Sequence, residues 1–469
     1  MEITNSINKK KIDILINWVN NNNIFVHSSI GISVRDNNVP KSIILSSKTS
    51  ELSYILNNTK IPNIISLCIA YMYEKSLGQK SLWYGYLQII PDKVDIPKFW
   101  GHEKNWLKGT EIEYIGGLDI SELYKTYQDL IIPFIKKNEK ILNQNTFTYD
   151  NFLKAISIIR SRAFEIDKFH GLGLVPFADI FNHTITKEHV HFQTFYEVCE
   201  YCGSSTHIDH TKHQNYDKLL SNNYIKNTFY NDTCDMVIYN SPNASNEIFN
   251  TYGAHGNDIL LSRYGFAIPE NKWDRISMSK TVEKNYLKQD RLLWWKLNGF
   301  KVSYQMGLFQ KYFSKEDIKN YIAECNNDHN TKFCTYCQNN QYLFLQDSLF
   351  LGFPSIPSLT LIFFITLLSL NSKLFKKFKK SKKNSIILIL NIIKLQSFLF
   401  YYTGYINKLK HQKYKTLLIM LKINKILLSA INNRLKKYNQ ISNLEYFISE
   451  ETKVQVFNIL KIIAILIKL

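Results

Sequence analysis

The sequence predicts an α+β protein in which a mixed first part is followed by an all-helical second part. Residues 24–270 alternate helical periodicity with short β-branched segments, whereas residues 283–469 show nearly continuous helical periodicity with few Gly or Pro breaks. A chain of 469 residues has room for two or three domains. We therefore expect an N-terminal helix over residues 1–23, a mixed domain over 24–270 and a helical domain over 283–469.

The mixed domain should begin with strands and then accommodate a helical insertion. Short β-type segments follow the first helix at residues 24–26 and 31–35. The insertion, near residues 63–165, begins after a proline, and its first helix places Ile64, Leu67, Cys68 and Tyr71 on one face. Further strands are expected within residues 174–183 and 235–252, because these segments have an apolar, β-branched character.

Composition excludes a disordered chain and leaves the partner open. Hydrophobic residues make up 45% of the chain and charged residues 21%, a globular balance. The net charge of +19, from 58 Lys and Arg against 39 Asp and Glu, favours acidic or phosphate-bearing partners, but A/T-rich codon usage explains it equally well. We infer no direct nucleic-acid specificity.

No signal peptide or membrane span is predicted. The N-terminus lacks an uninterrupted apolar core and a small-residue cleavage site. The most apolar run, residues 356–370, contains Pro357 and is shorter than the roughly 20 residues that span a bilayer, so we expect a buried helix. Seven cysteines, an odd number, indicate a reducing compartment and a cytoplasmic location.

Three segments together indicate the chemistry. They read SRAF at residues 161–164, LVPFADIFNH at 174–183 and YGAHGNDILLSRYGF at 252–266. In order and spacing they resemble the SET-domain family typified by the plant Rubisco large-subunit methyltransferase, and within it the fungal lysine methyltransferases that act on ribosomal proteins and elongation factors. The resemblance implies a SET-domain β-fold with a knot-like active site, S-adenosylmethionine as cofactor and a helical substrate-docking domain.

Tyr252 is the residue that the resemblance places in the catalytic channel. Its hydroxyl would orient the substrate amine and also contact the cofactor, and Phe164 and Tyr264 are candidate walls on the substrate side. Methyl transfer is an in-line displacement, so amine and methyl carbon must be held about 3 Å apart in a dry, aromatic channel. For an isolated Tyr-Gly pair, a half-buried strand tyrosine would be the ordinary interpretation.

Four further residues match the cofactor and substrate positions of the family. Asn182 and His183 match the pair that holds the cofactor through neutral hydrogen bonds. Arg162 matches an arginine near the cofactor carboxylate, and Asp179 matches a carboxylate on the substrate side. Taken alone, the first pair would indicate a turn or helix cap, and the charged residues a surface ion pair. Together they predict that distant stretches converge beside Tyr252.

The N-terminal cofactor motif departs from the family pattern. An acidic residue opens a Gly-rich turn in the plant relative, but here the stretch reads Ser28-Ser29-Ile30-Gly31 and only the glycine is retained. Ile30 and Gly31 are still expected to approach the cofactor through their main chain, because that contact needs a close backbone more than a particular side chain.

Two cysteine pairs have the spacing of zinc ligands. Cys199 and Cys202 precede three histidines, and Cys334 and Cys337 follow Cys325 and His329. Structural zinc requires four such ligands, and the first cluster has no clear fourth. Reduced surface cysteines are the more ordinary interpretation, so we predict no metal and keep the four paired cysteines as weak candidates.

The function that the resemblance implies is S-adenosylmethionine-dependent protein-lysine N-methylation, with an elongation factor or ribosomal protein as substrate. Two alternatives stay open from the sequence: a catalytically silent SET fold that binds proteins, and a histidine methyltransferase of the same fold. A basic run at residues 373–383 could bind an acidic protein, RNA or an anionic membrane, although a solvated face is commoner.

Overall fold

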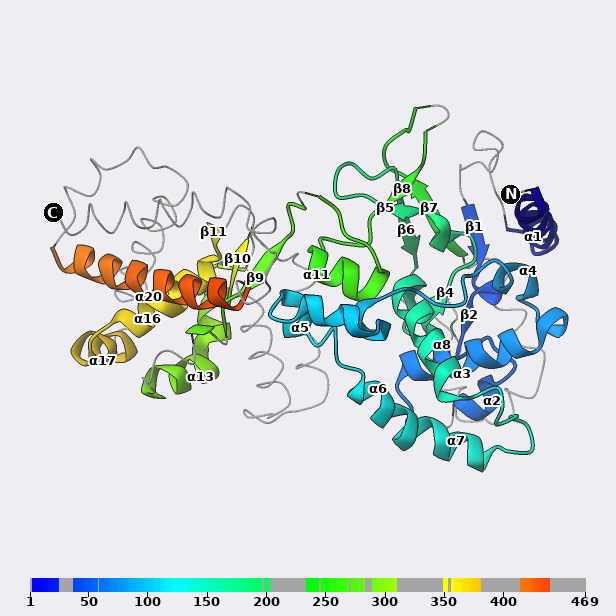
Figure 1. The fold of residues 1–469 in the computed structure, drawn as a ribbon, viewed down its shortest axis with the longest axis horizontal. Helices are drawn as coiled ribbons and strands as arrows, with labels where there is room; N and C mark the ends of the chain where they lie inside the picture. The colour runs from blue at the N-terminus through cyan, green and yellow to red at the C-terminus, as the bar shows by residue number, and fades with distance from the viewer. Residues whose placement is uncertain are drawn as a thin grey trace. The chain divides into compact units, whose positions relative to one another are not determined.

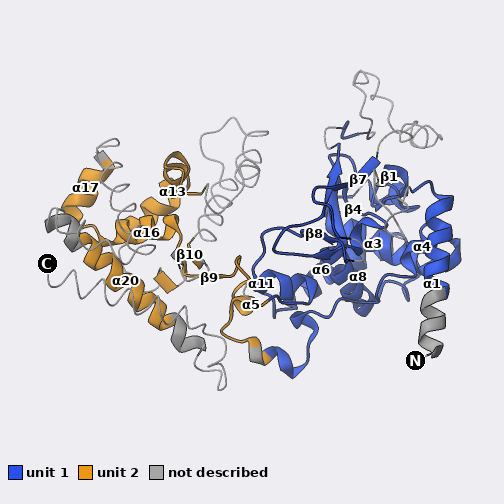
Figure 2. Ribbon diagram, turned by 90° about the horizontal axis from the view of Figure 1, so that it is seen from above, with its two compact units in different colours: residues 1–104, 116–268 blue, residues 105–115, 269–469 orange. Residues whose placement is uncertain are grey.

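The computed structural model describes residues 2–24, 37–57, 59–195, 198–201, 203, 233–243, 246–269, 271–279, 281–282, 289–309, 349–352, 356–380 and 414–438. These residues divide between two units (Figures 1 and 2). Unit 1 comprises Met1–Lys104 and Gly116–Ile268, and unit 2 comprises Asn105–Ile115 and Pro269–Leu469.

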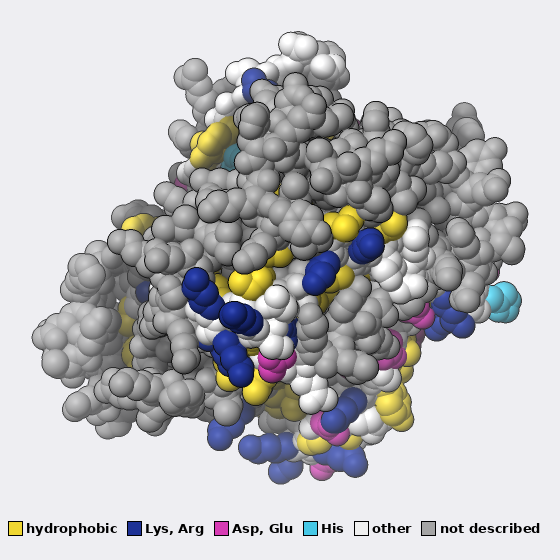
Figure 3. Space-filling view, turned by 90° about the vertical axis from the view of Figure 1, so that its left-hand side faces the viewer, with side chains coloured by type: hydrophobic (Ala, Val, Ile, Leu, Met, Phe, Trp, Pro, Cys, Tyr) yellow, Lys and Arg dark blue, Asp and Glu magenta, His cyan; other side chains and the backbone are white. Residues whose placement is uncertain are grey.

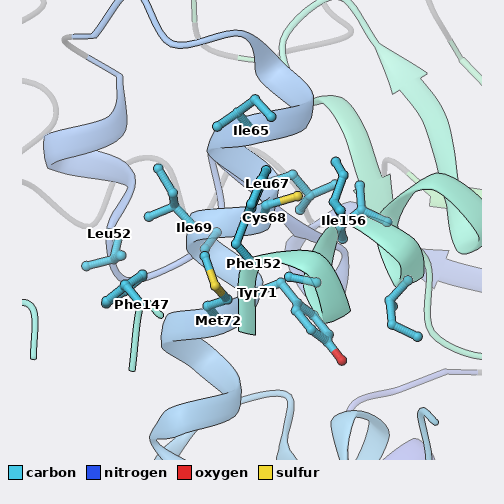
Figure 4. Close-up of a cluster of buried hydrophobic side chains, with 14 of the residues drawn as sticks. Leu52, Ile65, Leu67, Cys68, Ile69, Tyr71, Met72, Phe147, Phe152 and Ile156 are labelled. Atoms are coloured by element: carbon cyan, nitrogen blue, oxygen red, sulfur yellow. The ribbon is translucent and has the colours of Figure 1, made fainter. Parts of the chain in front are cut away.

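Two helices form the centre of the largest core of unit 1. Helix α3 (Asn63–Ser76) begins directly after Pro62, and α8 (Tyr149–Arg162) begins after Thr148, whose hydroxyl accepts a hydrogen bond from the Asn151 amide at 3.2 Å. Leu67, Cys68 and Tyr71 of α3 are buried as predicted (Figure 4), whereas Ile64 is only partly buried. Every residue from Ile65 to Met72 is buried, so α3 is surrounded on all sides and has no single core face. Around this pair lie α1 (Glu2–Asn21), α2 (Ser53–Leu56), α4 (Tyr84–Leu87), α6 (Ser121–Thr126) and α7 (Ile132–Lys137).

The strands of unit 1 form three small sheets. One antiparallel sheet has the order β1 (Asn37–Pro40), β7 (Thr233–Ile238), β6 (Val190–Thr194). A second has the order β2 (Leu45–Ser46), β4 (Gly171–Leu174), β3 (Ala163–Asp167). The third is a parallel pair of β5 (Asn182–His183) and β8 (Phe249–Asn250). Small sheets beside helices confirm the α+β class for the first part of the chain.

The end of strand β3 is anchored by a buried ion pair. The Lys41 ammonium lies 2.8 Å from the Asp167 carboxylate and donates to the Phe195 carbonyl at 3.0 Å, and both charged side chains are fully buried. His170 Nδ1 lies 2.9 Å from the same carboxylate. Burial alone would raise the pKa of Asp167, but hydrogen bonds with His170 and Lys41 hold that pKa at about 2. The anchor fixes the strand that leads away from Arg162.

Helix α8 ends earlier than its sequence pattern suggests. We expected helical structure through Phe164, but the helix ends at Arg162 and Phe164 lies in β3, paired with Gly173 of β4. Tertiary pairing overrides local helical propensity here, because the strand satisfies its backbone groups against β4. Within residues 174–183, where short strands and loops were expected, the structure has the end of β4 at Leu174, a 3-10 turn at Ala178–Ile180 and β5 at Asn182–His183.

The described residues of unit 2 are largely helical, as predicted, and they also include a small sheet. Its helices are α5 (Glu111–Tyr114), α13 (Gln289–Gln305), α16 (Leu359–Ser369), α17 (Ser372–Lys380) and α20 (Tyr414–Tyr438). The sheet has the order β11 (Ile356–Pro357), β10 (Phe350–Gly352), β9 (Arg275–Ser277). The sequence did not reveal these strands, since each is only two or three residues long.

The apolar run at residues 356–370 is a buried helix that starts three residues late. Pro357 belongs to β11, and Ser358 caps α16 by accepting from the Leu361 amide. Every residue of α16 from Thr360 to Ser369 is buried. Within the residues that the structure describes, no helix is both long and apolar enough to cross a membrane.

Candidate active site

Segments far apart in the sequence converge where β5 meets β8. Asn182 pairs with Phe249 and His183 with Asn250, and the Thr184 amide donates to the Asn250 carbonyl at 3.0 Å. Tyr252 follows β8 directly, so the parallel pairing brings it to the Asn-His pair. The convergence expected from the sequence is therefore present in unit 1.

Tyr252 is fixed at both ends against the β5 segment. Its amide donates to Nδ1 of His183 at 3.0 Å, and its hydroxyl donates to the Phe181 carbonyl at 2.9 Å. The rings of Tyr252 and His183 stack with centroids 5.1 Å apart and planes inclined by 24°. This ring pair is held by main-chain and side-chain contacts together, which leaves the tyrosine little freedom to change rotamer.

Aromatic rings from the following turn extend this stack. Tyr264 lies 4.8 Å from Tyr252, and Phe266 lies 6.4 Å from Tyr252 and 6.2 Å from His183, all between ring centroids. The four side chains are half-buried or nearly buried. They make an aromatic wall of the kind that suits a low-polarity channel. Phe266 was not among the predicted site residues, although it stands two residues after Tyr264.

The turn that presents Tyr264 and Phe266 is closed by Asn257 and Gly265. The Asn257 side chain donates to the Ile268 carbonyl and accepts from the Ile268 amide, both at 2.8 Å. Gly265 has a φ of +80°, and a Cβ atom there would lie 2.5 Å from the Asp95 carbonyl oxygen. Only glycine fits this close approach without movement of the backbone.

A buried charged network lies beside the aromatic wall. The Arg162 guanidinium donates from Nη1 to the Asp179 carboxylate at 3.0 Å and to the Asp179 carbonyl at 3.1 Å. The Tyr86 hydroxyl donates to the same carboxylate oxygen at 2.9 Å. Phe177, two residues before Asp179, has a φ of +74° and therefore a strained backbone that the surrounding fold must maintain.

Tyr86 is a member of this network that sequence reasoning missed. It lies on α4, more than 90 residues before Asp179, and its side chain is fully buried beside Trp18 of α1. Its sequence neighbourhood, WYGYL, contains no signal that selects one tyrosine over the other. Only the fold shows which hydroxyl reaches the carboxylate.

Burial sets the protonation states at this site. It raises the pKa of Tyr252 to about 12, with Arg162 opposing the rise and Asp179 adding to it. Burial also lowers the pKa of His183 and raises that of Asp179, the latter against the opposing effect of Arg162 and Tyr86. At neutral pH, Tyr252 is therefore a hydrogen-bond donor and His183 a neutral imidazole.

Three buried polar atoms of the site have no hydrogen-bond partner among the described residues. They are His183 Nε2, Arg162 Nε and Asp179 Oδ1. A buried polar atom without a partner is costly, so a ligand with both donor and acceptor groups would satisfy what the protein leaves unsatisfied. The residues present thus fit a polar cofactor that carries charged ends.

The remaining predicted residues are placed as follows. Asn182 is exposed, and its side-chain amide donates to Glu247 at 2.6 Å. Phe164 stacks on Phe192 of β6 at 4.5 Å, in the cluster that also contains Phe181. No ring contact joins Phe164 to Tyr252 in the part of unit 1 that the structure describes. Ile30 and Gly31 lie outside the described residues.

The predicted metal candidates lie mostly outside the described residues as well. Cys202, Cys334 and Cys337 are not described, and Cys199 is half-buried with its carbonyl accepting from the Gly203 amide at 2.8 Å. Among the residues that can be described, no group of three His, Cys, Asp or Glu side chains is arranged to hold a metal ion.

Comparisons with known proteins identify lysine methyltransferases as relatives. Ribosomal lysine N-methyltransferase 3 of Saccharomyces cerevisiae is 28% identical over 59% of this chain and 61% of its own length. N-lysine methyltransferase setd6 of Xenopus laevis is 25% identical over 49% of this chain and 47% of its own. The chain thus spans less than two thirds of either relative.

Neither a family model nor a strong structural match adds evidence for the relationship to lysine methyltransferases. No family model matches the chain. The solved SET domain of LSMT bound to lysine and AdoHcy aligns with 98% of this chain and 90% of its own, at 16% identity and a TM-score of 0.49. The resemblance to lysine methyltransferases that the three motifs indicated is confirmed by the sequence relatives.

Proposed function

We propose that this chain is an S-adenosylmethionine-dependent protein-lysine N-methyltransferase with a SET-type active site in unit 1. One observation supports the proposal above all: Tyr252 stacks on His183 and is hydrogen-bonded at both ends to the β5 segment. The relatives' names as lysine N-methyltransferases support it independently.

The site residues can hold the cofactor from two sides. His183 and Arg162 each present a buried nitrogen without a partner among the described residues, and Asn182 lies next to His183. A neutral imidazole and a side-chain amide suit an adenine base, whereas the guanidinium suits a carboxylate. When bound, S-adenosylmethionine supplies the methyl group as a sulfonium substituent.

The aromatic wall favours an uncharged substrate amine. A lysine with an ordinary pKa near 10.4 must lose its proton before attack, at a cost of roughly 4 to 5 kcal/mol at neutral pH. Tyr252, Tyr264 and Phe266 form half-buried surroundings that disfavour the ammonium and so lower this cost. The site would hold the substrate amine after its proton has left to solvent, so that the uncharged nitrogen could accept the methyl group that bound S-adenosylmethionine would supply.

Tyr252 would orient the reacting groups. Its hydroxyl remains protonated because burial raises its pKa to about 12. In this structure the hydroxyl contacts the Phe181 carbonyl, so one side of the substrate amine would face a tyrosine oxygen and a main-chain oxygen held together at 2.9 Å. Positioning of this kind is the main source of catalysis in an in-line transfer.

The substrate and the docking region remain proposals. A ribosomal protein as substrate is supported by the relative named ribosomal lysine N-methyltransferase, and an elongation factor stays a proposal from the motif resemblance. We propose that substrate docking belongs to the helical region over residues 283–469, that the SET domain covers 24–270, and that the protein acts in the cytoplasm.

Radiolabel transfer from S-adenosylmethionine to a ribosomal fraction tests the proposal. Tyr252→Phe should lower kcat about 100-fold, as expected for loss of one preorganised donor, with cofactor affinity nearly unchanged by calorimetry. Asn182→Ala should instead weaken cofactor binding. Tyr124→Phe, at an exposed tyrosine of α6, is the matched control and should behave as wild type.

Two results would contradict the proposal. Absence of S-adenosylmethionine binding in calorimetry would indicate a silent binding module. Mass spectrometry that finds the methyl group on histidine would identify a histidine methyltransferase.

A further inference from the structure

Helix α17 presents a face made of lysines. Lys373, Lys376, Lys377 and Lys379 are exposed, and α17 contains no acidic residue. Dark blue lysine and arginine side chains are prominent on the face of the molecule shown in Figure 3. The four lysines span about 9 Å along the helix axis at 1.5 Å per residue.

The apolar residues of α17 are turned into the core of unit 2. Phe375 is 1% exposed and Phe378 7% exposed, and their rings lie 6.4 and 5.0 Å from that of Trp294. An amphipathic helix that enters a membrane must place such aromatic residues in the lipid. Because α17 already buries them in protein, its exposed face offers charge and little apolar surface.

The lysine face is not neutralised within the part of unit 2 that the structure describes. No ion pair with a carboxylate is formed there by any of the four lysines. Lysines three and four positions apart on a helix, such as Lys373 with Lys376 or Lys377, repel one another. A bound polyanion would relieve this repulsion.

The helix is also held in place at its start. The Arg291 guanidinium donates to the Leu370 carbonyl at 2.9 Å and lies 4.7 Å from the centre of the Phe375 ring. The Asn371 side chain accepts from the Leu374 amide at 2.9 Å, as a helix cap does. The charges are therefore presented by a fixed helix, which lowers the entropic cost of binding.

We propose that the lysine face of α17 binds the phosphodiester backbone of RNA without reading its sequence. Lysine acts as a point charge on phosphate, and α17 exposes no arginine that could read a base edge. Protein interfaces are depleted of lysine and need an apolar centre, which this face does not offer. The choice of RNA over DNA rests on the proposed function, in which the substrate belongs to the translation machinery.

Binding to a short RNA duplex of mixed sequence at several salt concentrations tests this inference. Four phosphate contacts give a slope of log K against log salt of roughly −3 to −4, so this face contributes a loss of about 60- to 250-fold between 50 and 200 mM salt. In the full chain, the quadruple variant K373Q/K376Q/K377Q/K379Q should lose roughly that slope. A matched K125Q/K136Q/K137Q/K140Q variant changes four exposed lysines of unit 1 and should retain it.

A charge-preserving variant separates lost charge from lost structure. K373R/K376R/K377R/K379R should bind with the wild-type salt slope, and thermal melting should show that each variant is folded. Equal weakening in both glutamine variants, or binding to phosphatidylserine vesicles and not to RNA, would overturn the inference. Ultraviolet crosslinking in cells should recover RNA, and recovery of DNA alone would contradict the choice of RNA.

This assay is independent of methyl transfer. It needs neither cofactor nor protein substrate, so failure to bind RNA leaves the transfer assay unaffected. Conversely, a chain that binds RNA through α17 but transfers no methyl group would contradict the proposed function alone.

Discussion

Gly265→Ala should damage the aromatic wall, and the structure allows the magnitude to be divided into two parts. The residue has a φ of +80°, a conformation that costs alanine roughly 1 to 2 kcal/mol. The added Cβ would also lie 2.5 Å from the backbone oxygen of Asp95, so one of the two segments must move. Overpacking of this kind costs about 1 to 3 kcal/mol.

A comparison with Gly116→Ala separates the cost of the backbone conformation from the cost of overpacking. Gly116 has a φ of +76°, but a Cβ atom there meets nothing within 4 Å, so only the backbone conformation is penalised. For a unit of this size, 1 kcal/mol lowers Tm by roughly 2 to 4 °C. We expect Gly116→Ala to lower Tm by roughly 2 to 8 °C and Gly265→Ala by roughly 4 to 20 °C.

The two variants should differ more in activity than in stability. Movement at residue 265 displaces Tyr264 and Phe266 from Tyr252, and a displacement of about 1 Å can lower the rate about 100-fold. Thermal unfolding and methyl transfer should be measured side by side on both variants. If Gly265→Ala is no less stable and no less active than Gly116→Ala, the reasoning from close packing at this turn is wrong.

Three further outcomes follow from the hydrogen bonds and pKa shifts. Tyr86→Phe should reduce methyl transfer about 5-fold while cofactor affinity stays nearly constant, because Asp179 loses one donor worth roughly 1 kcal/mol; an unchanged kcat would exclude a positioning role. The folded-state pKa of Asp167 is lowered from 3.8 to about 2, so its contribution of roughly 2 to 3 kcal/mol is present above about pH 4 and is lost as the pH falls toward 2. Urea unfolding across this range should show the loss, and Asp167→Asn should remove that pH dependence. Burial lowers the pKa of His183, and a protonated Nδ1 cannot accept from the Tyr252 amide, so cofactor affinity should fall only at a pH below the ordinary range of histidine titration; a calorimetric profile that stays flat down to the pH at which the protein unfolds would contradict this.

The site residues could be predicted because their motifs resemble those of a known family. Asn182, His183 and Tyr252 stand in motifs whose order and spacing indicated one family, and the structure brings the three together. That α3 is a core helix was also predictable, but its periodicity indicated one buried face and the fold buries every residue from Ile65 to Met72. Each of these motifs is made of residues close together in the sequence, although the motifs themselves lie far apart.

What the tertiary structure decided depends on long-range contacts. Contacts between residues far apart in the sequence set three features of the fold. Tyr86 reaches Asp179, Phe164 leaves the helix to pair with Gly173, and Phe350 joins a small sheet. No local pattern encodes such pairings, because every residue type except proline carries the same backbone donor and acceptor, and a side chain's partner depends on where the fold places it. The sequence by itself therefore determined which chemical groups are present at the site, and only the fold decided which of them touch.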